Sequence, residues 1–198
     1  ITGLGGSGIG GKIVAQLVAN DILVPVAINN DYHLPNFVNE NTLVIASSFS
    51  GNTEETLAAL SKAQEKGAEI ACITSGGKML EIAINNNYNH IIIPLGKSPR
   101  AMLSYSLTQQ FFLLNHYNLI GNDFIQKIQN SIELLNLEIE NIKTEAKNIA
   151  NSILNKTTVI YSEANFEGVA IRLRQQLNEN AKVLCWHHVL PEMNHNEL

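Results

Sequence analysis

Short runs of β-branched and other apolar residues alternate with amphipathic stretches along most of the chain, and this alternation restricts the fold more than any other feature. Such runs are typical of strands that are buried on both faces of a parallel sheet. The stretches between them have the spacing of helices with one apolar face. The sequence therefore predicts an α/β fold in which a parallel sheet is flanked by helices.

The boundaries of the expected elements follow from the apolar spacing and from local start and stop signals. The expected strands are residues 23–28, 42–47, 69–74, 90–95, 157–162 and 182–186. The expected helices are residues 8–20, 53–66, 79–85, 101–118, 123–154 and 163–177. Thr53 is well placed to cap its helix, and Gly67 is expected to end it. The helix over 123–154 is long and polar on one side, which is typical of a linker between two units.

The length of 198 residues is sufficient for one domain and part of a second. We expect a first domain over residues 1–121, a linker helix over 122–156, and the start of a second copy of the fold over 157–198. The chain enters a glycine-rich loop at Gly3, although loops of this kind normally follow a strand. We therefore expect an internal piece of a longer protein, missing one strand at the front and more at the back.

The composition excludes several classes of protein. The chain has 45% hydrophobic and 16% charged residues, which indicates a globular protein and not a disordered one. It has 13 basic and 18 acidic residues and no cationic run, so no nucleic-acid partner is expected. No apolar segment reaches the roughly 18 residues that span a bilayer, and the start lacks a signal-peptide pattern. Cys72 and Cys185 lie alone in apolar runs, which predicts buried thiols and a cytoplasmic location.

The first glycine loop, residues 3–12, matches two nucleotide-binding motifs loosely. Gly3, Gly5 and Gly8 have the spacing of the dinucleotide fingerprint, in which glycines let the backbone approach a pyrophosphate. That motif needs an acidic residue after the next strand, and Asn29 and Asn30 stand there instead.

The P-loop is the second motif. Gly6, Gly11 and Lys12 match its spacing, but Ile13 occupies the place of the hydroxyl that binds the metal ion. Glycines that only permit a tight turn remain an alternative to both motifs.

A second loop, rich in hydroxyl groups, supports a phosphate-binding role for the first. Ser48, Ser50 and Thr53 follow the strand expected over 42–47 and precede a helix. Hydroxyl groups together with free amides at a helix start can hold a phosphate monoester without a metal ion. Ordinary helix capping is the alternative. Because two such loops at neighbouring parallel strands meet at one crevice, the pattern favours a phosphate site.

Several motifs resemble a known family. Residues 5–11, 48–56 and 98–101 resemble the sugar isomerase (SIS) domain, and residues 178–182 and 191–197 resemble the bifunctional phosphoglucose/phosphomannose isomerase family. The resemblance implies a flavodoxin-like SIS fold and an isomerase that interconverts glucose 6-phosphate and fructose 6-phosphate through a cis-enediolate. It implies that no cofactor and no metal ion are needed, and it leaves open whether mannose 6-phosphate is also a substrate.

The resemblance also implies roles for individual residues. Glu179 matches the family's general base, Arg100 the arginine that stabilises the enediolate, and His195 the histidine that opens the sugar ring. In the family this histidine comes from the other subunit, so a homodimer is expected. The residues that the resemblance assigns to the substrate phosphate are Gly6, Ser7, Ser48, Ser50, Gly51 and Thr53. The family also uses a lysine from its C-terminal region, which this sequence does not contain.

Two other groups of residues have simpler interpretations. Arg172 and Arg174 lie on the helix before Glu179, where structural ion pairs are expected. The polar residues near the end of the chain fit no recognised zinc spacing, so no metal site is expected. This group consists of His187, His188, Glu192 and His195.

Other functions remain open at this stage. A regulator that binds a sugar phosphate would need the phosphate loops but not Glu179, Arg100 and His195, and the presence of all three favours an enzyme. The isomerase half of an amino-sugar synthase shares the loops but needs a partner domain for ammonia transfer. A dinucleotide-dependent oxidoreductase is the remaining alternative.

Overall fold

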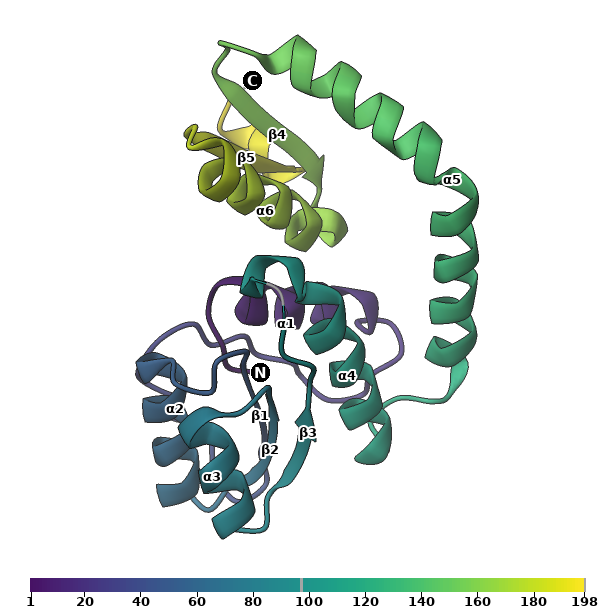
Figure 1. Ribbon diagram of the computed structural model, residues 1–198. Coiled ribbons are helices and arrows are strands. Elements are labelled where there is room, and N and C mark those ends of the chain that lie inside the picture. Colours follow the sequence, from purple (N-terminus) through teal and green to yellow (C-terminus); the bar gives the residue numbers. More distant parts are fainter. Residues whose placement is uncertain (97, 198) are drawn as a thin grey trace. The chain divides into compact units, whose positions relative to one another are not determined.

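The computed structural model describes residues 1–96 and 98–197 and divides into two compact units, with the boundary between Ile120 and Gly121. Each unit contains a parallel sheet with helices packed on it (Figure 1). The predicted α/β fold with a parallel sheet flanked by helices is therefore confirmed. The expected division of the second unit into a linker helix and the start of a second copy of the fold stays a prediction.

The first unit has a parallel sheet with the strand order β1-β2-β3. Its elements are α1 (Gly5–Leu17), β1 (Leu43–Ser48), α2 (Glu54–Glu65), β2 (Glu69–Thr74), α3 (Gly77–Asn85), β3 (Asn89–Ile92), the short 3-10 helix η1 (Pro99–Ala101) and α4 (Leu103–His116). Ala46 is paired with Cys72, and Cys72 is paired with His90, so consecutive strands are neighbours joined by crossover helices.

The residues at the start of the chain extend this sheet. Thr2 forms parallel bridges with Ala46 of β1 on one side and with Asn29 on the other. The order across the sheet is therefore residues 27–29, residues 1–3, β1, β2 and β3. The predicted strand over 23–28 is wrong, because only the bridge at Asn29 forms there and Leu23 is 99% exposed. Pro25 has no N–H group to donate to a neighbouring strand.

Helices cover both faces of the first sheet. Helices α2 and α3 pack on one face, and α1 and α4 contact β1 and β2, respectively, on the other and also pack against each other (Figure 1). Successive residues of a strand point to opposite faces, so β1 and β2 each contribute to two apolar layers. The core on the α2 and α3 side consists of Val38, Val44, Ala46, Leu60, Ala63, Ile70, Cys72, Met79 and Ala83. This packing holds the carboxyl ends of the strands, and the loops that follow them, at one edge.

The second unit contains a two-stranded parallel sheet. Its elements are the long helix α5 (Asp123–Ile153), β4 (Thr158–Glu163), the 3-10 helix η2 (Ala164–Phe166), α6 (Glu167–Gln176), the π-turn η3 (Leu177–Ala181), β5 (Cys185–Leu190) and the 3-10 helix η4 (Glu192–His195). Helix α6 packs on both strands. Every second residue of the two strands is exposed, because α6 covers one face only.

The predicted boundaries hold best where the local pattern is clear. The strand over 69–74 and the helix over 123–154 are confirmed to within one residue. The strand expected over 90–95 ends at Ile92, and Pro94 follows, which cannot donate to a sheet. The strand expected over 182–186 is wrong at its start, because Lys182 has a left-handed backbone with φ of 58°. The carbonyl of Val183 accepts a hydrogen bond from the Asn178 side chain at 2.7 Å, so this segment is bonded to the preceding turn.

Cys72 and Cys185 are both free and buried, which confirms the prediction of buried thiols. Burial raises the pKa of the Cys72 thiol to about 12. Among the described residues, none of the helices combines the length and the apolar character needed to cross a bilayer.

Candidate functional site

The glycine loop leads directly from the sheet into α1. This helix begins at Gly5, three residues before the predicted start at Gly8. Ser7 therefore lies in the first turn, where it is half-buried. The first-turn amides of a helix have no acceptor inside the helix, and no side chain caps them here. The amides of Gly5 and Gly6 are thus suited to bind an anion.

Asn30 holds the first loop in shape, a role that the sequence did not reveal. Its side-chain amide donates to the carbonyl of Gly3 at 2.6 Å. A Cβ atom on Gly8 would lie 2.4 Å from the same carbonyl oxygen, so only glycine fits at that position. The side chain of Asn29 donates to Thr2 Oγ1 at 3.2 Å. Both asparagines therefore contact the backbone or side chains of residues 2–3, which explains their positions without a nucleotide.

The second loop contains a hydroxyl pair. Ser48 Oγ and Thr53 Oγ1 lie 2.9 Å apart, and the amide of Gly51 donates to Ser48 Oγ at 3.1 Å. Ser50 is exposed, and its Oγ accepts the amide of Asn52 at 3.2 Å. Thr53 is the N-cap residue of α2, as predicted, but its side chain makes no capping hydrogen bond. The first-turn amides of α2 are therefore left without a side-chain cap, which favours the phosphate interpretation of the loop over the capping one.

Residues that follow β2 brace the second loop. The amide of Lys78, in the first turn of α3, donates to Asn52 Oδ1 at 3.1 Å, and the amide of Ser75 donates to the Phe49 carbonyl at 3.0 Å. Gly51 has φ of +67°, and a Cβ atom there would lie 1.8 Å from the carbonyl oxygen of Gly76. The segment that follows β2 therefore fixes the conformation of the second loop. Asn52 is a second structural residue that sequence reasoning missed, although it lies within the recognised motif.

The two loops are neighbours in space. The amide of Thr2 donates to the Ile45 carbonyl and the amide of Ser47 donates to the Thr2 carbonyl, both at 2.9 Å. Gly3 and Ser48 consequently leave adjacent parallel strands at the same edge of the sheet. The sheet thus brings together the two segments that contain all six predicted phosphate-binding residues.

Two carboxylates lie near this edge, and their placement bears on anion binding. Glu54 and Glu55 stand in the first turn of α2. The pKa of Tyr32 is raised by desolvation and then by the negative charges of Glu55 and Glu54. These carboxylates therefore lie close to the Tyr32 side chain, and they moderate the positive potential of the α2 N-terminus.

Arg100 lies in η1, the 3-10 helix after β3. Its side chain is exposed, and η1 packs against α1, the helix that begins in the first glycine loop. The segment that carries Arg100 is therefore brought next to α1, although β3 is two strands away from the strand that precedes the second loop.

Glu179 is exposed in the π-turn η3 at the end of α6. Asn178 donates to the Val183 carbonyl at 2.7 Å, and Asn180 hydrogen-bonds back to Gln176. The two asparagines hold the turn from both sides and leave the carboxylate between them exposed. Desolvation lowers the pKa of Arg172, and the negative charge of Glu179 opposes this effect, so the two side chains lie close together.

Arg174 has a structural role, although its partner is not a carboxylate. Its Nη1 lies 3.0 Å from His187 Nδ1, and His187 Nε2 lies 3.4 Å from Glu167 Oε1. These contacts connect the two ends of α6 to β5.

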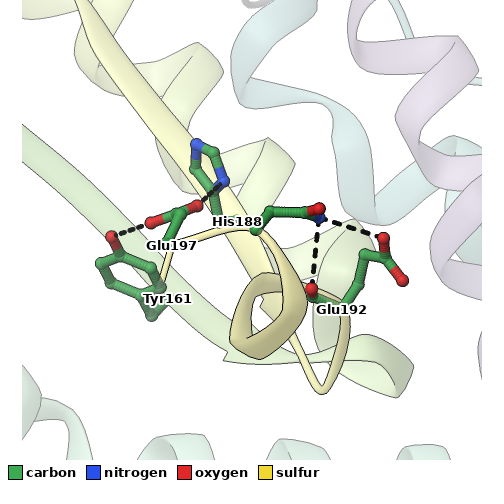
Figure 2. Close-up of polar contacts among 5 residues, drawn as sticks. Tyr161, His188, Glu192 and Glu197 are labelled. Carbon is green, nitrogen blue, oxygen red and sulfur yellow. Dashed lines mark hydrogen bonds and ion pairs between the residues drawn. The ribbon is translucent and has the colours of Figure 1, made fainter.

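His195 is the last residue of η4 and is exposed. Residues close to it in the sequence make polar contacts (Figure 2). His188 pairs with Glu197, which also accepts a hydrogen bond from the Tyr161 hydroxyl at 2.7 Å. Asn196 donates to Glu192 Oε1 at 3.0 Å.

The polar residues near the end of the chain do not assemble into a metal site. His187 and His188 are consecutive in β5, so they point to opposite faces of the sheet. His187 contacts α6, and His188 contacts Glu197. Among the residues that the structure describes, no three His, Cys, Asp or Glu side chains are placed to hold one ion.

A comparison with protein-family models shows which family the chain belongs to. The SIS domain model matches residues 1–117, which include both loops and Arg100. The chain belongs to the SIS-domain family. A second model, the bacterial phospho-glucose isomerase C-terminal SIS domain, matches residues 142–198, which include Glu179 and His195. This match begins within α5.

Curated relatives of this SIS chain are considerably longer. The bifunctional phosphoglucose/phosphomannose isomerase of Caldicellulosiruptor bescii is 41% identical over 205 residues, covering 100% of this chain and 60% of the relative. The D-glucosamine-6-phosphate 4-epimerase of Sulfolobus acidocaldarius is 36% identical over 197 residues, covering 99% of this chain and 61% of the relative. The chain thus spans about three fifths of the length of these relatives.

A solved structure supports the fold alone. The C-terminal domain of glucosamine-fructose-6-phosphate aminotransferase from Francisella tularensis has a TM-score of 0.73 and 16% identity, covering 98% of this chain and 58% of that one. The SIS fold is therefore shared where little of the sequence is.

Proposed function

We propose that the protein containing this chain is an aldose-ketose isomerase that interconverts glucose 6-phosphate and fructose 6-phosphate through a cis-enediolate. The observation that carries the proposal is the hydroxyl pair Ser48 and Thr53 at an uncapped helix start, in a chain that also presents Glu179 in a turn held by asparagines. The name of the Caldicellulosiruptor relative supports the same reaction. Mannose 6-phosphate is proposed as a second substrate.

In this proposal the two loops of the first unit hold the phosphate. Ser50 and Ser7 each donate a hydroxyl proton to the phosphate. The oxygens of Ser48 and Thr53 are within hydrogen-bond distance of each other, so these two hydroxyls together supply one further donor. The amide of Gly6 adds a donor, and Gly51 contributes through the shape of the loop, because its own amide already donates to Ser48. Neutral donors and helix starts can hold a phosphate without a metal ion, so we propose neither a metal ion nor a cofactor for this site.

Glu179 is proposed as the general base. Interconversion of an aldose and a ketose moves a proton between C1 and C2, and a carboxylate placed beside these carbons can accept the proton and return it. Arg100 is proposed to stabilise the negative charge of the enediolate oxygen. A guanidinium group carries a positive charge and several N–H donors, and both stabilise a negatively charged oxygen.

His195 is proposed to open the sugar ring and to act in the site of a second copy of the chain. The six residues of β5 separate the turn that carries Glu179 from η4, which carries His195. A strand of this length spans about 17 Å between its first and last Cα atoms. Glu179 and His195 of one chain therefore lie toward opposite ends of β5, which supports a homodimer in which each site takes its histidine from the partner.

The test replaces Glu179 by Gln in the whole protein and measures conversion of glucose 6-phosphate to fructose 6-phosphate. We expect turnover to fall by at least a factor of about 10³, because the amide cannot accept the proton. Glu145→Gln, an exposed carboxylate on α5, is the control and keeps its turnover. Retained turnover in Glu179→Gln refutes the assignment of the base. Conversion of glucosamine 6-phosphate alone supports the epimerase reaction that names the Sulfolobus relative.

A regulator that binds a sugar phosphate without converting it is the second candidate. One observation favours it: all six proposed phosphate-binding residues lie in the first unit, which has a core of its own. Such a regulator binds glucose 6-phosphate in a titration. The wild-type protein then converts neither glucose 6-phosphate nor mannose 6-phosphate nor glucosamine 6-phosphate.

A further inference from the structure

The segment that carries His195 is a closed turn. The amides of Asn196 and Glu197 both donate to the Met193 carbonyl, at 3.1 Å and 2.9 Å. Asn196 Nδ2 donates to the carbonyl and to Oε1 of Glu192, at 3.2 Å and 3.0 Å. The His195 ring is exposed and takes part in none of these bonds. Its position is therefore set by the backbone of the turn and by whatever holds the turn to the sheet.

Glu197 makes that connection through its two carboxylate oxygens. Oε2 accepts the hydroxyl of Tyr161 at 2.7 Å, and Oε1 pairs with Nδ1 of His188 (Figure 2). Tyr161 and His188 are directly opposite each other in the register of β4 and β5. Their ring centres are 6.0 Å apart. The carboxylate hydrogen bond is the leading cause that raises the pKa of Tyr161.

We propose that Glu197, held by Tyr161 and His188, is a positioning residue that fixes His195 for ring opening. We call these three side chains the Glu197 clamp. The inference rests on the proposed function, because it assigns the clamp to a step of that reaction.

The physical basis is the difference in rigidity between the strands and the turn. Tyr161 and His188 belong to paired strands, whose backbones are fixed by the hydrogen bonds between the two strands. Glu197 follows His195 by two residues, so a contact at Glu197 limits His195 to within about 7 Å of a fixed point. Without the clamp, the turn keeps its covalent link and its packing to the end of β5 but loses the side-chain contacts that the clamp makes. A misplacement of about 1 Å costs a catalytic group up to about 10²-fold in rate.

The exposure of the clamp is consistent with a positioning role. The side chain of Glu197 is 27% exposed and that of His188 is 47% exposed, and pairs of this kind contribute little to global stability. Loss of the clamp is therefore expected to change the position of His195 without unfolding the second unit.

The experiment compares two reactions in the whole protein. Isomerisation of glucose 6-phosphate needs both ring opening and proton transfer, whereas interconversion of its α and β anomers needs ring opening only. Anomer interconversion is measured by NMR exchange in a Glu179→Gln background, which lacks the proposed base. The clamp variants are Tyr161→Phe, Glu197→Gln and Glu197→Ala.

We expect kcat for isomerisation to fall about 10-fold to 100-fold in Glu197→Ala and less in Glu197→Gln, which can still accept the Tyr161 hydroxyl. KM is expected to change less than about 3-fold, because none of the six residues proposed to bind the phosphate belongs to the clamp. Catalysed anomer interconversion is expected to fall by the same factor as kcat. Tyr161→Phe removes one oxygen atom only, and we expect a fall of about 3-fold to 10-fold.

The chain offers a matched control. Tyr117 donates to Glu69 Oε1 at 2.7 Å, which repeats the chemistry of Tyr161 and Glu197 within the first unit, on elements that do not carry His195. Tyr117→Phe is expected to leave both rates within a factor of about 2.

Three results overturn the proposal: unchanged kcat in Glu197→Ala, a lower kcat with unchanged anomer interconversion, or no catalysed anomer interconversion in the Glu179→Gln background. The wild-type rate separates this inference from the proposed function. If the wild-type protein does not isomerise glucose 6-phosphate, the function itself is wrong.

Discussion

The hydroxyl oxygens of Ser48 and Thr53 lie 2.9 Å apart across the turn that joins β1 to α2. Only one proton can occupy the line between two hydroxyl oxygens, so one of the two groups donates to the other and the second keeps its proton for a different acceptor. The pair thus presents one directed donor beside the uncapped amides of α2. A phosphate oxygen is the acceptor that we propose for it.

Removal of either hydroxyl is expected to weaken binding of the substrate phosphate. Hydrogen bonds to charged groups contribute about 1.5 kcal/mol or more, so Ser48→Ala and Thr53→Val should each raise KM for glucose 6-phosphate roughly tenfold. The double variant should raise KM by less than the product of the two factors, because the hydroxyls act as a unit. Steady-state kinetics on the whole protein measure all three values.

The control for this series is Ser61→Ala, which removes an exposed hydroxyl from α2, the helix that Thr53 precedes. It should leave KM unchanged. Fully multiplicative effects of Ser48→Ala and Thr53→Val would contradict the shared donor.

Gly51→Ala is expected to destabilise the first unit. Gly51 has φ of +67°, and a Cβ atom would lie 1.8 Å from the backbone oxygen of Gly76, which cannot move aside easily. Left-handed backbone costs a non-glycine residue about 1–2 kcal/mol, and the overlap adds to this, so we expect a loss of about 2 kcal/mol or more. Urea unfolding measures it. Gly121→Ala is the control, because no atom lies within 4 Å of its Cβ position, and a loss as large there would contradict the explanation.

The sequence predicted those parts of the fold that local pattern determines. The strand at Glu69–Thr74 is an apolar run between a helix stop and a helix start, and both signals lie within a few residues of it. The strand expected over 23–28 failed because its outcome depends on pairing with residues 1–3, which are distant in the sequence. Local spacing contains no information about such a partner.

In the candidate site, too, the sequence predicted the local motifs but not the contacts between residues that are distant in the sequence. The motif containing Ser48 and Thr53 was visible in the sequence, but capping and phosphate binding could not be separated until the absence of a side-chain cap was known. The sequence alone shows Asn30 only as a residue in the place of an acid, because its contact with Gly3 joins residues 27 positions apart. The Glu197 clamp depends on the register of Tyr161 and His188, which no spacing rule supplies.

The pKa of Cys72 predicts how stability depends on pH. Burial raises this pKa to about 12 in the folded chain, well above the value of about 9 for an exposed thiol. Below pH 9 the thiol is protonated in both states, and its contribution is fully present. Between about pH 9 and 12 the unfolded thiol ionises while the folded thiol stays protonated, so the free energy of unfolding should fall as the pH rises.

Urea unfolding at pH 8 and pH 10.5 tests the effect. Cys72→Ala should be less stable than the wild type at pH 8, because a buried sulfur atom is lost, but its stability should fall less between the two pH values. An equal fall in both proteins would show that Cys72 does not contribute.

Mixed dimers test whether His195 acts in the site of the partner chain. Glu179→Gln and His195→Ala are each expected to be inactive alone. If each site takes its base from one chain and its histidine from the other, a mixed dimer has one site with both groups intact and one site with neither. Random reassociation of equal amounts gives mixed dimers as about half of the population, so the mixture should recover about one quarter of the wild-type activity. Sites built from a single chain would recover none, because every site would then lack one of the two groups.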